Sequence, residues 1–115
     1  MKSRGHLDDK SPGIESVLKR VQEEVHSVLP GAEIILYGSR ARGDASPVSD
    51  WDFLILVDKP LDRDLITKVK NCLYDLELET DTVLSSIIRT RQEWHSDRYS
   101  VLPFKRMVEQ EGISL

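Results

Sequence analysis

Hydrophobic residues along the chain change their spacing several times, and each change predicts a new element. After Ser11-Pro12, a typical helix start, apolar residues fall on one helical face as far as Pro30-Gly31, which ends the helix. These positions are Ile14, Val17, Leu18, Val21, Val25, Val28 and Leu29. A second amphipathic helix is predicted from Pro60 onward. Its apolar positions are Leu61, Leu65, Ile66, Val69, Cys72, Leu73 and Leu76.

Three short apolar runs predict strands. They cover Glu33–Tyr37, Ser49–Val57 and Thr82–Ile88. The second run is continuously apolar after its first residues, which is typical of a strand covered on both faces. Pro103 opens a last short helix, and Gly112 follows its end. Taken together, the predicted helices and strands indicate an α+β (mixed α/β) fold.

The composition indicates one globular domain. The chain has 115 residues, of which 39% are hydrophobic and 31% charged. We expect a flexible, polar lead-in over residues 1–10 and a single domain over residues 11–115. The net charge of −4 argues against a protein that coats nucleic acid in general, because such proteins are normally basic.

The cysteine content and the hydropathy of the chain indicate where in the cell the protein is expected. No apolar run approaches membrane-spanning length, and the first ten residues lack the apolar core of a signal peptide. Cys72 is the only cysteine, so no intrachain disulfide can form, and we interpret it as a packing residue of the second helix. We therefore expect a cytoplasmic protein that does not bind membranes.

Candidate chemistry begins at a turn between the first two predicted strands. Gly38 lacks a Cβ, so the backbone can bend sharply there and approach a ligand closely. Ser39 adds a hydroxyl, and exposed N–H groups at a strand-to-helix turn favour phosphate. Arg40 and Arg42 add forked donors that suit phosphate oxygens. The segment predicts a phosphate-binding turn.

An acidic pair follows at the start of the second strand. Asp50 and Asp52 lie two residues apart, so a strand places both carboxylates on one face, with Trp51 and Phe53 on the other. Carboxylates this close repel each other unless a cation lies between them, and Mg²⁺ takes such oxygen ligands together with substrate phosphates. An isolated pair of this kind is more often two solvated acids, but the turn at Gly38 favours a metal site.

Two segments of the chain, residues 38–43 (Gly-Ser-Arg-Ala-Arg-Gly) and residues 49–52 (Ser-Asp-Trp-Asp), resemble a known signature. It belongs to the nucleotidyltransferases related to DNA polymerase beta, and the nearest branch is that of the minimal nucleotidyltransferases paired with HEPN-domain proteins in toxin–antitoxin operons. The resemblance implies the nucleotidyltransferase fold, a small mixed sheet of about three to four strands covered by helices.

The resemblance also implies a third carboxylate on a strand beside the acidic pair. Asp81 is the candidate, because it immediately precedes the third apolar run, and Glu79 has the same strand parity and is the alternative. The chain departs from the family pattern at Thr82, where an aliphatic residue is usual, and a plain turn acid at Asp81 is the competing interpretation. With Asp81, the resemblance implies two Mg²⁺ ions shared with Asp50 and Asp52.

The implied reaction transfers a nucleoside monophosphate, AMP from ATP, to an acceptor hydroxyl. Because 115 residues leave no room for an acceptor-binding domain, we expect the acceptor to be a separate molecule. The resemblance implies a HEPN-type partner protein modified on a hydroxyl such as that of tyrosine, with this chain as its antitoxin. One alternative is a non-catalytic antitoxin that acts by docking alone. Another is transfer to a small molecule or RNA, which requires an additional domain or a homodimer to supply the acceptor pocket.

Overall fold

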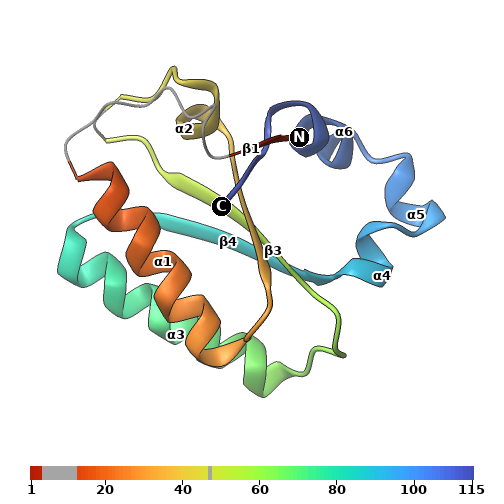
Figure 1. The fold of residues 1–115 in the computed structure, drawn as a ribbon, viewed down its shortest axis with the longest axis horizontal. Helices are drawn as coiled ribbons and strands as arrows, with labels where there is room; N and C mark the ends of the chain where they lie inside the picture. The colour runs from red at the N-terminus through yellow and green to blue at the C-terminus, as the bar shows by residue number, and fades with distance from the viewer. Residues whose placement is uncertain (4–12, 47) are drawn as a thin grey trace.

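A computed structural model describes residues 1–3, 13–46 and 48–115, which form helices packed on a mixed sheet (Figure 1). The helices are α1 Ile14–Val28, α2 Ser39–Arg42, α3 Arg63–Thr80, α4 Arg91–Trp94, α5 Asp97–Ser100 and α6 Pro103–Glu111. The strands are β1 Lys2–Ser3, β2 Glu33–Tyr37, β3 Trp51–Val57, β4 Leu84–Thr90 and β5 Ile113–Ser114. Residues 4–10 of the predicted lead-in and the helix start at Ser11-Pro12 lie outside the described residues, whereas Lys2–Ser3 form β1.

The strands join in one sheet of order β1-β5-β2-β3-β4. β2 runs antiparallel to β3 and to β5, while β3 runs parallel to β4 and β1 runs parallel to β5. The predicted α+β fold with a mixed sheet is confirmed. The sheet is wider than the apolar runs indicated, because β1 and β5 are only two residues long and carry no alternating pattern.

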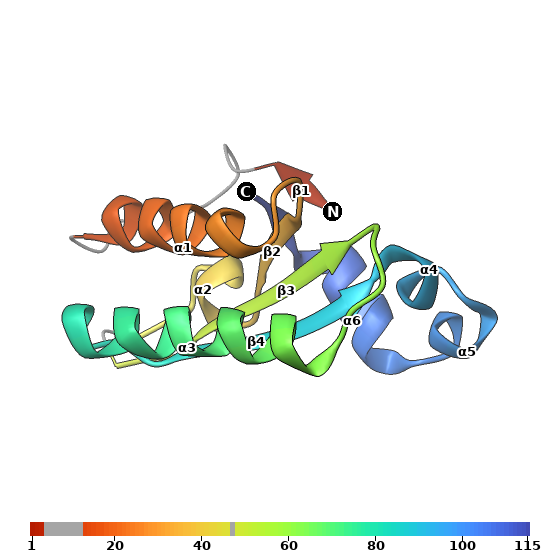
Figure 2. The same cartoon turned by 90° about the horizontal axis from the view of Figure 1, so that it is seen from below.

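Successive residues of the central strand face two separate cores. Phe53 packs on the face that α1 and α3 cover, and Leu54 packs on the opposite face against Trp94 of α4 and Val108 of α6. Figure 1 shows α1 and α3 side by side, and Figure 2 shows α4 and α5 beyond the end of β4. β3 is therefore covered on both faces, as its continuous apolar run predicts.

α3 ends later than its apolar pattern predicted. The helix continues through Thr80, whose hydroxyl donates to a carbonyl oxygen one turn earlier. Asp81 is the C-cap with φ 53, a left-handed conformation that Asp tolerates better than most residues. The interpretation that Glu79 and Asp81 share a strand parity is therefore wrong. The strand that follows begins at Leu84 rather than at Thr82.

Two expectations drawn from composition can be compared with this fold. Within the described part of the chain, no helix combines the length and the apolar character that crossing a membrane requires. Cys72 is a free, partly buried cysteine on α3, and burial is the main cause that raises the pKa of its thiol. A raised pKa disfavours the reactive thiolate form of Cys72.

Candidate functional site

The turn that joins β2 to α2 closely approaches Asp52 of the acidic pair. Gly38 adopts φ 79 and ψ −160, a conformation that is essentially restricted to glycine. A Cβ built on Gly38 would lie 2.4 Å from Oδ2 of Asp52. Tyr37 pairs with Asp52 in the sheet, so Gly38 and the partly exposed Ser39 follow directly beside this carboxylate. The structure thus brings the predicted phosphate-binding turn and Asp52 together.

The acidic pair combines one exposed and one half-buried carboxylate. Asp50 is exposed just before β3, and Asp52 is partly buried within it. Burial raises the pKa of Asp52, the Asp50 carboxylate raises it further, and the Arg42 charge acts in the opposite direction. A divalent cation bound by both carboxylates would offset their repulsion. These two carboxylates would fit one Mg²⁺ ion, which would need its remaining oxygen ligands from substrate phosphates and water.

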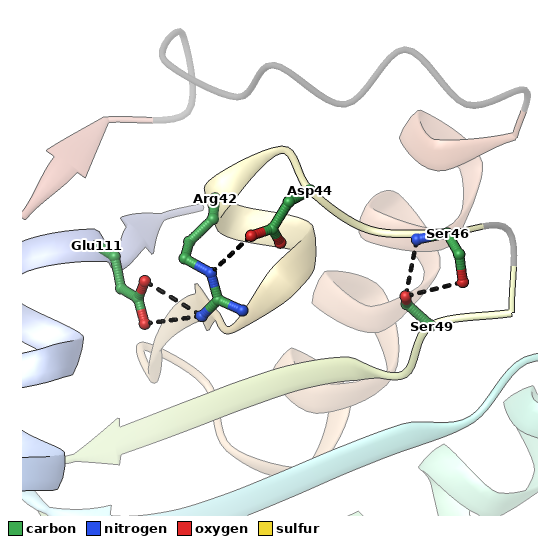
Figure 3. Close-up of polar contacts among 5 residues, drawn as sticks. All are labelled: Arg42, Asp44, Ser46, Ser49 and Glu111. Atoms are coloured by element: carbon green, nitrogen blue, oxygen red, sulfur yellow. Dashed lines mark hydrogen bonds and ion pairs between the residues drawn. The ribbon is translucent and has the colours of Figure 1, made fainter.

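Hydrogen bonds fix the chain on both sides of Asp50. Before it, the backbone N–H of Ser46 donates to the hydroxyl oxygen of Ser49 at 2.9 Å, as Figure 3 shows. After it, the backbone N–H of Trp51 donates to the carbonyl oxygen of Val83 at 2.9 Å. The loop from α2 is therefore closed just before the acidic pair, and β3 is anchored to the segment that leads into β4.

Arg40 lies on the other side of β3 from Asp52. Its side chain is buried, at 5% exposure, and its guanidinium carbon lies 4.3 Å from the ring centroid of Trp51. Nη2 of Arg40 donates to the carbonyl oxygen of Ser49 at 3.1 Å. Trp51 belongs to the core under α1 and α3, so the stacked guanidinium packs against that core. The structure does not bring Arg40 to the Asp52 side of the sheet, where the phosphate role was predicted.

Arg42 lies nearer to the acidic pair and is held by two carboxylates (Figure 3). Its Nε donates to Oδ2 of Asp44 at 3.2 Å, and its Nη1 donates to Oε1 and Oε2 of Glu111 at 3.2 and 3.3 Å. The Arg42 side chain is 44% exposed, so the guanidinium is accessible to a ligand. The sequence did not predict Glu111 as a partner of Arg42, because the two residues are 69 positions apart and no local pattern signals such a pair.

The third carboxylate that the resemblance implies does not join the other two. Asp81 is exposed at the end of α3. It lines a pocket of about 350 Å³ that Arg40 and Ser49 also line. Because Arg40 belongs to the Trp51 side of β3, this pocket does not collect Asp81 with Asp50 and Asp52.

The alternative acid, Glu79, is also placed elsewhere. Its carboxylate accepts a hydrogen bond from Nη2 of Arg20 on α1 at 2.7 Å. The β4 residue that pairs with Asp52 is Ser85, a hydroxyl where a third carboxylate would face the pair. Among the residues that the structure describes, no three His, Cys, Asp or Glu side chains are grouped closely enough to hold a metal ion.

Replacing Asp81 by Asn is therefore expected to leave Mg²⁺-dependent nucleotide binding within about twofold of the unchanged chain, since Asn tolerates the left-handed cap and no ligand is lost. Glu79→Gln is the matched control, and it should cost only the exposed ion pair to Arg20. Isothermal titration with ATP and Mg²⁺ measures both. A tenfold loss in Asp81→Asn alone would show that Asp81 reaches the metal site once nucleotide binds.

Comparisons with known proteins indicate the family and the fold of the chain. Residues 14–113 match the model of the nucleotidyltransferase domain family, which is most of the chain. A similar solved structure is the crystal structure of a toxin–antitoxin with AMP-PNP, with 18% sequence identity and a TM-score of 0.58. That match covers 84% of this chain and 69% of the other, and at this identity it shows the shared fold. Among curated proteins, no sequence matches the chain significantly. On the family match, the chain belongs to the nucleotidyltransferase domain family.

Proposed function

We propose that the chain is a Mg²⁺-dependent nucleotidyltransferase that moves a nucleoside monophosphate, AMP from ATP, to a hydroxyl of a partner protein. The observation that carries this proposal is the contact between Gly38 and the Asp52 carboxylate. Because the Gly38 turn lies directly beside Asp52, one residue of the acidic pair, a triphosphate held at the turn and its cation could be bound at one edge of the sheet.

Each residue of the proposed site has a role that follows from its chemistry. Asp50 and Asp52 would hold Mg²⁺, which neutralises phosphate charge when it is bound. The Gly38-Ser39 turn and Arg42 bind phosphate oxygens and orient the triphosphate. The acceptor hydroxyl oxygen attacks the α-phosphorus, the bond from that phosphorus to the β-phosphate oxygen breaks, pyrophosphate leaves, and the hydroxyl proton passes to water. Positioning and electrostatics supply most of the catalysis in such a reaction, so few reactive side chains are needed.

A partner protein as the acceptor has separate support. One solved structure with this fold is a toxin–antitoxin with AMP-PNP, an ATP analogue. By analogy, and by the resemblance of residues 38–43 and 49–52 to minimal nucleotidyltransferases, we assign this chain the antitoxin role. Its partner is then a HEPN-type toxin in the cytoplasm.

Label transfer tests the proposal directly. The purified chain is incubated with Mg²⁺ and a source-cell lysate, with either α-labelled or γ-labelled ATP. The expected result is label on one discrete protein band from α-labelled ATP alone, because the γ-phosphate leaves with pyrophosphate. Label only on RNA or small molecules would show that the acceptor is not a protein and belongs to one of those two classes. Label from γ-labelled ATP would indicate phosphorylation and contradict nucleotidyl transfer.

A second candidate function is docking to the partner without transfer. It is favoured by the hydroxyl of Ser85 at the position that pairs with Asp52 and by the separate placement of Asp81. The two candidates differ in one readout. A docking module neutralises its partner equally well as the Asp52→Asn variant, whereas an enzyme loses neutralisation together with transfer.

Replacing Ser39 by Ala is expected to weaken ATP binding about fivefold, because one hydroxyl donor to phosphate is lost, a contribution of about 1 kcal/mol. Ser39 is only partly buried at the start of α2, so the free energy of unfolding should change little. Titration calorimetry and urea unfolding measure the two effects. Ser100→Ala, at an exposed position on α5, is the matched serine control. Unchanged ATP affinity in Ser39→Ala would remove Ser39 from the phosphate site.

A further inference from the structure

An ion pair joins the last helix of the chain to the short helix that follows the Gly38 turn. Both carboxylate oxygens of Glu111 accept from Nη1 of Arg42, at 3.2 and 3.3 Å (Figure 3). Asp44 binds the same guanidinium through Nε at 3.2 Å. The Arg42 guanidinium is therefore held at two nitrogen positions by carboxylates from two different parts of the chain.

The two carboxylates are not equivalent supports. The Glu111 side chain is 19% exposed, whereas the Asp44 side chain is 61% exposed and lies only two residues from Arg42. Asp44 moves with the segment that carries Arg42, so it cannot fix that segment relative to the sheet. Glu111 belongs to α6 and is better shielded from water, where a charge-assisted hydrogen bond is stronger.

The position of Glu111 is itself fixed by the residues that follow it. Gly112 is buried, and a Cβ there would lie 2.5 Å from the carbonyl oxygen of Val108 and 2.9 Å from Cγ2 of Ile35. Directly after it, Ile113 pairs with Leu36 of β2, the strand that leads into the Gly38 turn. The position of Glu111 is thus fixed relative to β2, the same strand that positions the predicted phosphate-binding turn.

We propose that Glu111 is a positioning residue of the nucleotide site, which holds the Arg42 guanidinium in one orientation for the triphosphate. The inference rests on the proposed function and deepens it. Arginine has many rotamers, and ordering it at the moment of binding weakens binding, so a guanidinium ordered beforehand binds phosphate more tightly. Glu111 does not touch the reacting atoms and acts only through Arg42.

The test is a double-mutant cycle on binding of a non-hydrolysable ATP analogue with Mg²⁺, measured by calorimetry on the full chain. Glu111→Gln is expected to raise the dissociation constant about tenfold. In an Arg42→Ala background, where the guanidinium is absent, Glu111→Gln should add nothing. Glu111→Asp should recover part of the affinity. Where transfer is measurable, KM for ATP should rise while kcat stays within about twofold, because the lost interaction acts in binding.

The matched control is Glu109→Gln. Glu109 lies on the same helix, carries the same charge and pairs with Lys105 at 3.7 Å, away from Arg42. It should leave the dissociation constant unchanged, and the midpoint of urea unfolding should be the same in both glutamine variants. Equal affinity in Glu111→Gln and the unchanged chain would overturn the positioning role, as would an equal loss in the Arg42→Ala background. Tighter binding in Glu111→Gln would overturn it too, since Glu111 would then compete with phosphate for Arg42.

The two hypotheses fail in different ways. If the unchanged chain binds no ATP analogue with Mg²⁺, the proposed function fails, and the positioning role fails with it. If the unchanged chain binds and the cycle shows no coupling between Glu111 and Arg42, only the positioning role fails.

Discussion

Asp52→Asn is expected to abolish nucleotidyl transfer, with a loss of more than about 100-fold, because it removes one of the two carboxylates proposed to bind Mg²⁺. The amide is similar in size, so the contact with Gly38 can be kept. Burial raises the pKa of Asp52, which means that the ionised form is disfavoured in the folded state. An acid whose pKa rises on folding lowers stability above that pKa, so at neutral pH the Asn variant should be as stable or more stable. Label transfer and urea unfolding measure the two quantities.

Asp58→Asn is the matched control for this variant. Asp58 follows the opposite end of β3, is exposed and pairs with Arg91 at 2.5 Å. It should keep full transfer and lose at most the small free energy of a surface ion pair. Full transfer by Asp52→Asn would show that the metal site is wrongly assigned. Equal losses in both variants would point instead to a general effect of charge on the chain.

The part of the site that the sequence predicts well is the part that is local in the chain. The Gly38 turn needs only a glycine between a strand and a helix, and Asp52 needs only its place at the start of an apolar strand. The register of β2 against β3 then brings turn and carboxylate together, because the two strands are neighbours in sequence and in the sheet. The main elements of the fold follow from the same kind of local signal.

The features that the sequence did not predict depend on contacts between distant segments or on one backbone angle. The end of α3 is decided by the left-handed conformation of Asp81, which an acidic residue before an apolar run does not signal. The Glu111–Arg42 pair depends on where α6 packs, far from the turn in sequence. Arg40 stacks on Trp51 because a guanidinium can join a core through its flat face, although its place in the signature suggested a phosphate contact. The separation of Asp81 from the acidic pair has the same origin, since the end of α3 fixes where its carboxylate lies.

Gly38→Ala is expected to damage both the fold and the site. At φ 79 and ψ −160, a residue with a Cβ is strained by about 1–3 kcal/mol. The new methyl would also lie 2.4 Å from Oδ2 of Asp52, closer than atoms can approach, so the carboxylate must move. The free energy of unfolding should therefore fall by roughly 2–4 kcal/mol. ATP affinity should fall at least about tenfold, because turn and carboxylate no longer keep their contact. Urea unfolding and calorimetry with ATP and Mg²⁺ measure the two changes.

Gly31→Ala separates the two causes. Gly31 also has a positive φ, +81, but no heavy atom lies within 4 Å of where its Cβ would be. The free energy of unfolding of Gly31→Ala should therefore fall only by the cost of backbone strain, and its ATP affinity should not change. If Gly38→Ala were no more destabilising than Gly31→Ala and bound ATP normally, the close approach of Gly38 to Asp52 would be irrelevant to the site. If both variants lost stability but only Gly38→Ala lost affinity, the glycine is required at the turn because the Asp52 carboxylate occupies the space of its side chain.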